Sequence, residues 1–260
     1  MQSEVFDIYA KTYDEHFTNS LIGMAQREQV YQHVSRRFSD NIKNVLEVNC
    51  GTGQDALWFS EKGVTVLATD VSEGMIEIAK RKVNNNKVEF KKIASQQIDV
   101  LFPDMFNLIF SNFGGLNCLN HNELIDFKKG CSKLQQKDDL LIFVIMGTQC
   151  WWEQLYFKFK KDKIKANRRI NKLGVETVIN DKKFLTYYYT PNYFKELFFD
   201  GYDFLQVKPI GLFVPPSYLE PYFVNREITF NFLIWLDKLF GKFSFLSNYA
   251  DHYIIVFKKK

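Results

Sequence analysis

The sequence is short of the residues that mark several classes of protein. Its 260 residues include only 6 prolines and 13 glycines, which excludes collagen-like and linker-dominated chains. Charged residues make up 25% and hydrophobic residues 46%, proportions of a folded chain rather than a disordered one. No run of about 18 apolar residues occurs, so we expect no membrane-spanning helix. The first residues contain acids and no apolar segment of a signal peptide, which favours a cytoplasmic protein.

Cysteine is also scarce, and charge is nearly balanced. The four cysteines, Cys50, Cys118, Cys131 and Cys150, form no CxxC pair, and no histidine lies at metal-ligand spacing from them. We therefore expect reduced thiols and no metal site. The net charge of +4 is mild for this length, so nucleic acid is not an expected partner. Aromatic residues, in contrast, are abundant at 17% of the chain, with 26 Phe and 13 Tyr.

Strands and helices alternate through the middle of the chain. Short segments without polar alternation predict strands at 45–48, 64–70, 88–93, 106–112 and 139–147, the last of them almost wholly apolar. Helical spacing and capping residues predict helices at 21–39, 55–62, 72–83 and 121–134. Apolar strands that are separated by helices are typical of a parallel sheet covered on both faces.

The alternation stops after residue 147. Residues 149–172 are first aromatic and then basic, and the next segment predicts a β-hairpin that turns near Asn180 and Asp181. A helix is expected to begin at Thr190, with Pro191 in its first turn. Two further strands are predicted at 202–210 and 252–259.

A glycine-rich turn follows the first predicted strand. GTGQDA at 51–56 fits G-x-G-x-x-A between a strand and a helix, where glycines let the backbone approach a ligand closely. Asp70 ends the next strand, where a carboxylate can accept both hydroxyls of an adenosine ribose. The pattern predicts an adenosine-containing cofactor, either a dinucleotide or S-adenosylmethionine. Glu47, inside the first strand, favours the second, because its carboxylate complements a cationic amino group and sulfonium.

Several segments resemble the class I S-adenosylmethionine-dependent methyltransferases. LEVNCGTG resembles their E/D-x-G-x-G-x-G motif, ATDVSEGM their acidic-loop motif and FNLIFSNFGGLN their fourth-strand motif, over residues 40–147. Asn49 stands where the family has its first glycine, and Asn tolerates positive φ better than most residues. A narrower bacterial group with ELNCGTG-like, SNFGALNC-like, PPSYLEP-like and DHY-like segments resembles EVNCGTG, SNFGGLNC, PPSYLEP and DHY here.

The resemblance implies a fold and a domain organisation. We expect an α/β, Rossmann-like fold with a seven-stranded, mostly parallel sheet, an antiparallel last strand, helices on both faces and an inserted α+β cap. The implied parts are an N-terminal lid and helix (1–40), a cofactor-binding core (41–147), a substrate cap (148–190) and the rest of the core (191–260).

The resemblance also implies which residues bind S-adenosylmethionine. Glu47 and the backbone from Asn49 to Gly53 match the segment that holds the methionine moiety, and Asp70 matches the ribose acid. The family's usual adenine-edge Asp is absent, so Gln96 takes that place. The full set expected to bind the cofactor is Tyr13, Glu47, Asn49, Cys50, Gly51, Gly53, Asp70, Val71, Met75, Ala94, Ser95, Gln96, Ser111, Asn112 and Phe113.

The expected activity is methyl transfer to a small-molecule acceptor, with an apolar or aromatic one favoured. In-line displacement at the sulfonium methyl needs no covalent enzyme intermediate, so positioning supplies much of the rate. An oxygen or nitrogen acceptor benefits from a general base, for which His16 in the lid is preferred. The other candidate bases are His121, His252 and Tyr222. The residues expected to contact the acceptor are Trp151, Trp152, Tyr156 and Tyr218.

Other interpretations remain open at the level of sequence. The cap aromatics Trp151, Trp152 and Tyr156 can equally serve only to pack the cap onto the sheet. The basic run that follows them can attract an anionic substrate, contact a membrane surface or form a solvated helix face. An NAD(P)-dependent oxidoreductase keeps the glycine motif and Asp70 but leaves Glu47 without a role. A non-catalytic binding or scaffold protein is the third possibility. Methylation of nucleic acid is disfavoured, because SNFGGLN replaces the (D/N/S)-P-P-(Y/F) motif.

Overall fold

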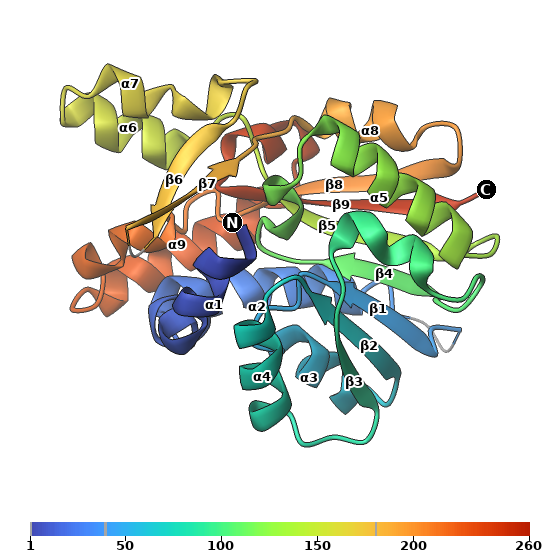
Figure 1. Cartoon of the computed structure of the whole chain (residues 1–260). Coiled ribbons are helices and arrows are strands. Elements are labelled where there is room, and N and C mark those ends of the chain that lie inside the picture. Colours follow the sequence, from blue (N-terminus) through green and yellow to red (C-terminus); the bar gives the residue numbers. More distant parts are fainter. Residues whose placement is uncertain (1, 39–40, 180) are drawn as a thin grey trace.

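A seven-stranded sheet forms the centre of the computed structural model, which describes residues 2–38, 41–179 and 181–260 (Figure 1). Its strand order is β3-β2-β1-β4-β5-β9-β8. Strand β9 is antiparallel to both of its neighbours, and the other neighbouring strands are parallel. This confirms the predicted Rossmann-like sheet with an antiparallel last strand. The strands are β1 (Asn44–Val48), β2 (Thr65–Asp70), β3 (Val88–Lys92), β4 (Leu108–Ser111), β5 (Leu140–Met146), β8 (Tyr202–Ile210) and β9 (His252–Lys259).

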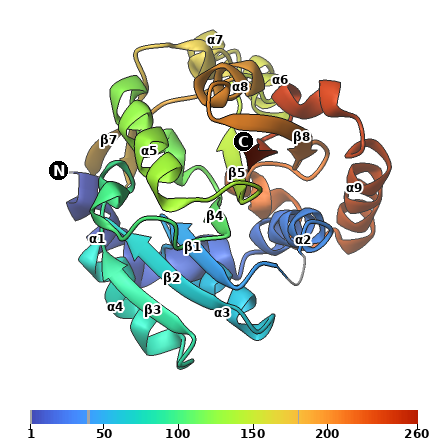
Figure 2. The same ribbon diagram turned by 90° about the vertical axis from the view of Figure 1, so that its right-hand side faces the viewer.

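Helices cover both faces of the sheet (Figure 2). Helices α2, α3 and α4 pack on one face, and α5 and α8 pack on the other. Side chains cap several of them as the sequence predicts: Ser72 accepts from the Met75 N–H and Thr190 from the Tyr193 N–H. The α-helices are α1 (Gln2–Tyr13), α2 (Leu21–Ser35), α3 (Gln54–Glu61), α4 (Glu73–Lys82), α5 (His121–Leu134), α6 (Trp151–Phe159), α7 (Lys163–Ala166), α8 (Pro191–Phe198) and α9 (Glu227–Phe240).

Alternation along β1 divides its side chains between the two faces. Leu46 and Val48 belong to the core under α5 and α8, whereas Val45 belongs to the core under α2, α3 and α4. Glu47, two residues after Val45, is therefore on the side of α2 and α3. A charged residue in a strand that is covered on both faces is buried with no route to bulk water.

The N-terminal segment is more regular than its resemblance to a flexible lid implies. It forms α1 and then a π-helical turn, Asp14–Thr18. The Asp7 carboxylate of α1 accepts from the Ser72 hydroxyl at 2.6 Å and from the Gly74 N–H at 2.9 Å. These bonds fasten α1 to the N-terminus of α4. The helix predicted at 21–39 ends at Ser35, and residues 39–40 lie outside the described part of the chain.

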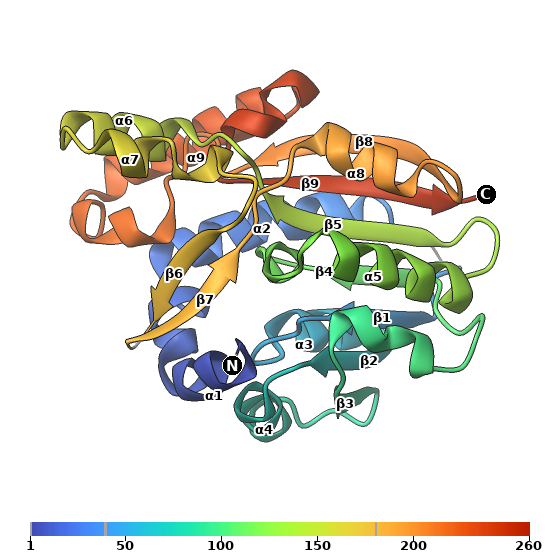
Figure 3. The same ribbon diagram turned by 45° about the horizontal axis from the view of Figure 1, so that its top comes forward.

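The segment predicted as a cap combines two helices with a hairpin. Helices α6 and α7 precede β6 (Val175–Ile179) and β7 (Lys182–Thr186), which pair with each other in a separate two-stranded sheet. Of the predicted turn residues, Asp181 has a φ of 60°, and Asn180 lies outside the described residues. The cap helices and α9 lie at the same end of the molecule, at the left in Figure 3.

Helix α9 is an element that the sequence did not lead us to predict. Its apolar run is interrupted by Asp237, which faces inward and accepts from the backbone N–H groups of Leu212, Phe213 and Val214. Burial raises the pKa of this carboxyl, and the backbone bonds oppose the rise. The acid is thus a link between α9 and the segment after β8. Among the described residues, no helix is both long and apolar enough to cross a membrane.

Candidate functional site

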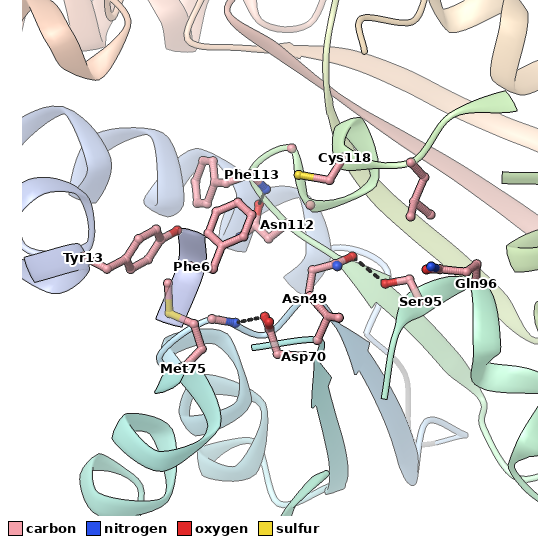
Figure 4. A pocket seen from close by; sticks show the side chains of 15 residues that line it. Phe6, Tyr13, Asn49, Asp70, Met75, Ser95, Gln96, Asn112, Phe113 and Cys118 are labelled. Carbon is pink, nitrogen blue, oxygen red and sulfur yellow. Dashed lines mark hydrogen bonds between the residues drawn. The ribbon is translucent and has the colours of Figure 1, made fainter. Parts of the chain in front are cut away.

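A cavity, here called the central cavity, lies at the carboxyl ends of β1, β2 and β4 (Figure 4). Parallel strands of an open α/β sheet bring loops with ligand-binding side chains together at this edge. Most of the residues predicted to bind a cofactor line it: Tyr13, Asn49, Gly51, Asp70, Val71, Met75, Ser95, Gln96, Asn112 and Phe113.

Two groups of residues differ from the prediction. Five residues that were predicted to bind the cofactor are not part of the cavity lining: Glu47, Cys50, Gly53, Ala94 and Ser111. The lining also includes residues that the sequence reasoning missed: Phe6, Gly114, Gly115, Cys118 and Leu119. Four of these residues lie in 114–119, directly after Phe113, which was the last residue predicted to bind the cofactor. The sequence could therefore have led to them.

The glycine turn follows β1 as predicted, with Asn49 in the place of a glycine. Asn49 has a φ of 57°, which confirms that it adopts the left-handed conformation. Its Oδ1 accepts from the Ser95 hydroxyl at 2.9 Å and the Ser111 hydroxyl at 3.4 Å. A Cβ on Gly115 would lie 2.4 Å from the Asn49 Cβ. The Asn49 side chain thus joins the loops after β1, β3 and β4, and Gly115 makes room for it.

Asp70 ends β2 with its carboxylate against the glycine turn. One oxygen accepts from the Gly51 N–H and the other from the Ser72 N–H, each at 2.9 Å. Burial raises the pKa of Asp70, and the backbone hydrogen bonds oppose that rise. Each carboxylate oxygen can accept more than one hydrogen bond. Asp70 can therefore hold the turn and accept ligand hydroxyls at the same time.

Glu47 lies beneath the cavity and is 1% exposed. Burial raises its pKa well above the usual range, the nearby Asp55 carboxylate adds to the rise, and Arg27 opposes it. The Glu47 Oε2 atom is buried and has no hydrogen-bond partner among the residues that the structure describes. A buried acid oxygen in this state has unused capacity for a donor or a cation.

Asp55, in the first turn of α3, organises one wall of the cavity. Its carboxylate accepts from Arg27 Nε at 3.1 Å, from the Tyr31 hydroxyl at 2.7 Å and from Asn112 Nδ2 at 3.0 Å. The Asn112 Oδ1 in turn accepts from the Phe113 N–H at 3.0 Å. Phe113 has a φ of 44°, an unfavourable value for an aromatic residue. The Asp55 network holds the loop after β4 in this conformation.

A second space, here called the outer chamber, adjoins the central cavity. Its walls come from α1, the β6–β7 hairpin, residues 216–218 and the start of β9. The two spaces have five lining residues in common: Phe6, Tyr13, Phe113, Gly114 and Cys118. The Tyr13 phenol is buried, which raises its pKa, so it is a neutral wall between them.

The candidate bases are placed differently from the prediction. His16 is exposed and lines neither the central cavity nor the outer chamber, so its position does not suit a general base. His121 contacts the Tyr193 hydroxyl at an exposed position. His252 is buried, lines the outer chamber and packs edge-on against Phe113 with ring centroids 5.5 Å apart. In the sequence, His252 lies in the DHY segment and was named among the other candidate bases.

The predicted acceptor residues are only partly brought together. Tyr218 lines the outer chamber. Trp152 and Tyr156 instead line an apolar groove between α6 and the 3₁₀ helix Ser217–Tyr222, and Trp151 lines neither space. In α6, Glu153 is the buried residue, and Trp152 donates from its Nε1 to the Phe213 carbonyl at 2.8 Å.

Arg168 and Arg169, from the basic run, take part in an interior ion network. Arg168 donates two hydrogen bonds to the Glu153 carboxylate, at 2.9 and 2.8 Å. Arg169 contacts the same carboxylate and also donates to Asp251 Oδ1 at 2.7 Å. Burial would raise the pKa of Asp251, but the charges of His252 and Arg169 hold it below the usual value. The Nδ1 atom of His252 lies 3.3 Å from Asp251 Oδ2, without hydrogen-bond geometry.

Comparisons with known proteins show what the chain is similar to. A family described as a methyltransferase domain matches residues 45–137. A malonyl-[acyl-carrier protein] O-methyltransferase of Priestia megaterium is 30% identical over 109 residues, which are 41% of this chain and 38% of that protein. The chain thus matches well under half of that relative's length. An uncharacterized protein of Methanocaldococcus jannaschii is 25% identical over 258 residues, covering 98% of this chain and 90% of its own.

The fold has known counterparts as well. A solved structure of an S-adenosylmethionine-dependent methyltransferase from Methanosarcina mazei superposes with a TM-score of 0.60 at 15% identity, over 87% of this chain and 96% of that one. The family match runs from β1 to the end of α5, the part of the chain that builds most of the central cavity. Residues 45–137 of this chain therefore match a methyltransferase domain, and the chain has the fold of S-adenosylmethionine-dependent methyltransferases.

Proposed function

We propose that this chain transfers a methyl group from S-adenosylmethionine in the central cavity to a small-molecule acceptor in the outer chamber. The observation that carries the proposal is the shared wall between the two spaces, formed by Phe6, Tyr13, Phe113, Gly114 and Cys118. Molecules bound on either side of that wall would meet there. Reacting groups held in contact gain much of their rate from proximity and orientation.

The residues of the central cavity fit the cofactor. Asp70 and Gln96 line the cavity, and in this proposal Asp70 binds the ribose hydroxyls and Gln96 the adenine edge. The orphaned Oε2 of Glu47 fits the cationic amino group of the methionine moiety, directly or through a water molecule. When bound, S-adenosylmethionine supplies an electrophilic methyl group on a sulfonium. A dinucleotide would place its anionic pyrophosphate at the glycine turn near Glu47, which is why we prefer the methyl donor over NAD(P).

The chain's own residues would position the acceptor and receive its proton. The Asp55 network holds Asn112 and Phe113 beside the shared wall. His252 lines the chamber and can accept a proton from a hydroxyl or amine, with the Asp251 carboxylate beside it to stabilise the resulting charge. The chamber lining includes Phe184 and Tyr188, which supports an apolar or aromatic acceptor.

Calorimetric titration of the ligand-stripped protein with S-adenosylhomocysteine, against NADH as the comparison, tests the proposal. We expect saturable binding of S-adenosylhomocysteine alone. Asp70→Ala should weaken it by at least about tenfold, the effect of losing hydrogen bonds to a charged acceptor. His252→Ala is the matched control, because it removes a chamber residue and should leave this affinity unchanged.

Three results would contradict the proposal. Binding of NADH alone would favour an oxidoreductase, and binding of neither would favour a non-catalytic protein. Unchanged affinity in Asp70→Ala would remove the ribose assignment. Because that variant also frees the Gly51 and Ser72 N–H groups, its thermal unfolding must be measured first to confirm that it is folded at the titration temperature.

A further inference from the structure

Large apolar side chains are exposed at the end of the molecule that carries α6, α7 and α9 (Figures 1 and 3). We call this surface the apolar end face. Its members are Leu155, Phe159, Ile164, Tyr222, Val224, Ile228, Phe232, Trp235, Leu239, Phe243 and Phe245.

Helix α9 contributes a continuous stripe to this face. Ile228, Phe232, Trp235 and Leu239 recur at spacings of four, three and four residues, which places them on one side of the helix. They are 89%, 55%, 54% and 40% exposed, respectively. The opposite side of α9 is anchored to the protein by Phe230, which is buried. Helix α9 therefore presents apolar groups outward, where a surface helix ordinarily presents polar ones.

The cap joins this stripe to α6 through an apolar groove. The groove is lined by Leu155 and Phe159 of α6, among others, and Phe159 is 92% exposed. Ring contacts continue from Trp152 to Phe223, with centroids 6.1 Å apart, and from Phe223 to Phe230 of α9, at 6.0 Å. Phe223 therefore packs between α6 and the inward side of α9.

Lysines border the apolar end face. The run from 158 to 172 has a single acid, Asp162, and six lysines: Lys158, Lys160, Lys161, Lys163, Lys165 and Lys172. The Lys160 ammonium lies 5.3 Å from the Tyr156 ring, and the Lys242 ammonium lies 5.3 Å from the Phe243 ring. Because Arg168 and Arg169 are committed to interior acids, the exposed charge of this run comes from its lysines.

We propose that the apolar end face binds the surface of an anionic lipid bilayer, with the outward stripe of α9 at the level of the headgroups. Tryptophan and phenylalanine with a lysine border are typical of interfacial helices, which gain affinity from apolar burial and from attraction to anionic lipid. A second copy docked on the same face by twofold symmetry would bring two lysine clusters together. Charge complementarity therefore favours lipid as the occupant.

Vesicle sedimentation tests this proposal with the full chain. We expect the protein to sediment with phosphatidylcholine vesicles that contain about a third phosphatidylglycerol, and far less with pure phosphatidylcholine. Phe232→Ser/Trp235→Ser and Lys160→Glu/Lys163→Glu should each lower the bound fraction at least about fivefold. Brominated lipid should quench tryptophan emission in the wild type, and Trp235→Phe should remove most of that quenching.

Matched controls separate the face from general hydrophobicity and charge. Phe102 is 78% exposed in the loop before β4, at the opposite edge of the sheet, so Phe102→Ser should leave vesicle binding unchanged. Lys137→Glu, in the turn before β5, controls for loss of positive charge. Far-UV circular dichroism must show that the double variants are folded.

Two outcomes would overturn the proposal. Equal binding of wild type and both double variants to anionic vesicles would show that the lipid contact lies elsewhere. Failure of the wild type to bind, together with a dimer on size-exclusion chromatography that Phe232→Ser/Trp235→Ser converts to a monomer, would assign the face to a second copy. The membrane proposal does not depend on the proposed methyl transfer.

Discussion

Glu47 is held at a position where the folded protein disfavours its negative charge. Burial is the main reason that its pKa is raised well above the usual range, and Asp55 and Asp70 add to the rise. A carboxyl whose pKa is higher in the folded state contributes stability that is fully present below its unfolded pKa and is lost as pH rises through the folded pKa. In the ligand-free protein, Glu47 therefore lowers stability toward higher pH.

Glu47→Gln should separate this effect on stability from cofactor binding. The neutral amide removes the charge that burial disfavours, so the ligand-free variant should lose less stability than wild type as pH rises from about 4. S-adenosylhomocysteine should bind about tenfold or more weakly, because the variant lacks the carboxylate that pairs with the amino group. Thermal unfolding across pH and calorimetric titration measure the two effects.

Proton release gives an independent measurement of the same pairing. A bound cation lowers the pKa of Glu47, so binding of S-adenosylhomocysteine should release protons in wild type, and the released amount should fall in Glu47→Gln. Titration in buffers of different ionisation enthalpy measures this directly. Equal affinity and equal proton release in the two proteins would show that Glu47 has no contact with the ligand.

Individual residues of the site could be predicted where a backbone requirement links residue type to position. Asn49 could be predicted to adopt a positive φ because it replaces a glycine of the turn. Asp70 could be proposed as a ribose ligand because the resemblance assigns that role to an acid at the end of the second strand. Asp55 was not, since its role depends on Asn112, which is distant in sequence. His252 was named as a candidate base, but the sequence did not show that it lines the outer chamber. Spacing along the chain contains no such information.

At the scale of elements, Asn117 joins three parts of the chain. It is fully buried in the 3₁₀ helix Gly115–Cys118. Its Oδ1 accepts from the Met146 N–H at the end of β5 at 2.9 Å, and its Nδ2 donates to the Met146 carbonyl at 3.1 Å and to the Tyr187 carbonyl. The Tyr187 N–H also donates to the Asn117 carbonyl. The hairpin β6–β7 is therefore tied to β5 by one side chain.

Asn117→Ala should destabilise the protein and loosen the hairpin. The substitution removes three part-buried hydrogen bonds to the Met146 and Tyr187 backbones, which costs about 2–4 kcal/mol of unfolding free energy. Chemical denaturation measures the loss, and hydrogen exchange should increase most in 175–187. Asn122→Ala, at an exposed position early in α5, is the matched control and should change neither measurement. A loss of stability below about 0.5 kcal/mol would contradict the assigned role.

Helices could be predicted from the sequence where one side is polar, and strands where both faces of the sheet are covered by helices. The strands from 45–48 to 139–147 are apolar runs in a covered sheet, and β8 and β9 were predicted with the bounds that the structure has. Helix α9 was missed because its apolar segment was considered only as a possible membrane span. The sequence did not show that Trp152 and Tyr156 line the apolar groove rather than the outer chamber, because helical spacing does not say which neighbouring segment a side of α6 packs against.

At the scale of the whole molecule, α1 closes a site that the rest of the chain builds. Phe6 and Tyr13 of α1 line both spaces, and Phe6 packs on Phe184 of the hairpin with ring centroids 5.3 Å apart. Asp7 holds the helix against α4 through the Ser72 hydroxyl and the Gly74 N–H. A ligand covered by α1 can exchange only when this contact opens, so closure and affinity should be coupled.

Gly74→Ala tests that coupling without touching either space. Its Cβ would lie 2.8 Å from the Asp7 carbonyl oxygen and 2.9 Å from the Asp7 Cα, both of them backbone atoms that can move only with α1. Alanine also strengthens α4 by about 1 kcal/mol, so any loss comes from the contact with α1. We expect faster hydrogen exchange across 2–17 and at least about fivefold weaker binding of S-adenosylhomocysteine, because the closed state is less populated. Glu77→Ala, at an exposed position of the same helix, should change neither quantity. Faster exchange with unchanged affinity would mean that α1 covers the site without contributing to binding.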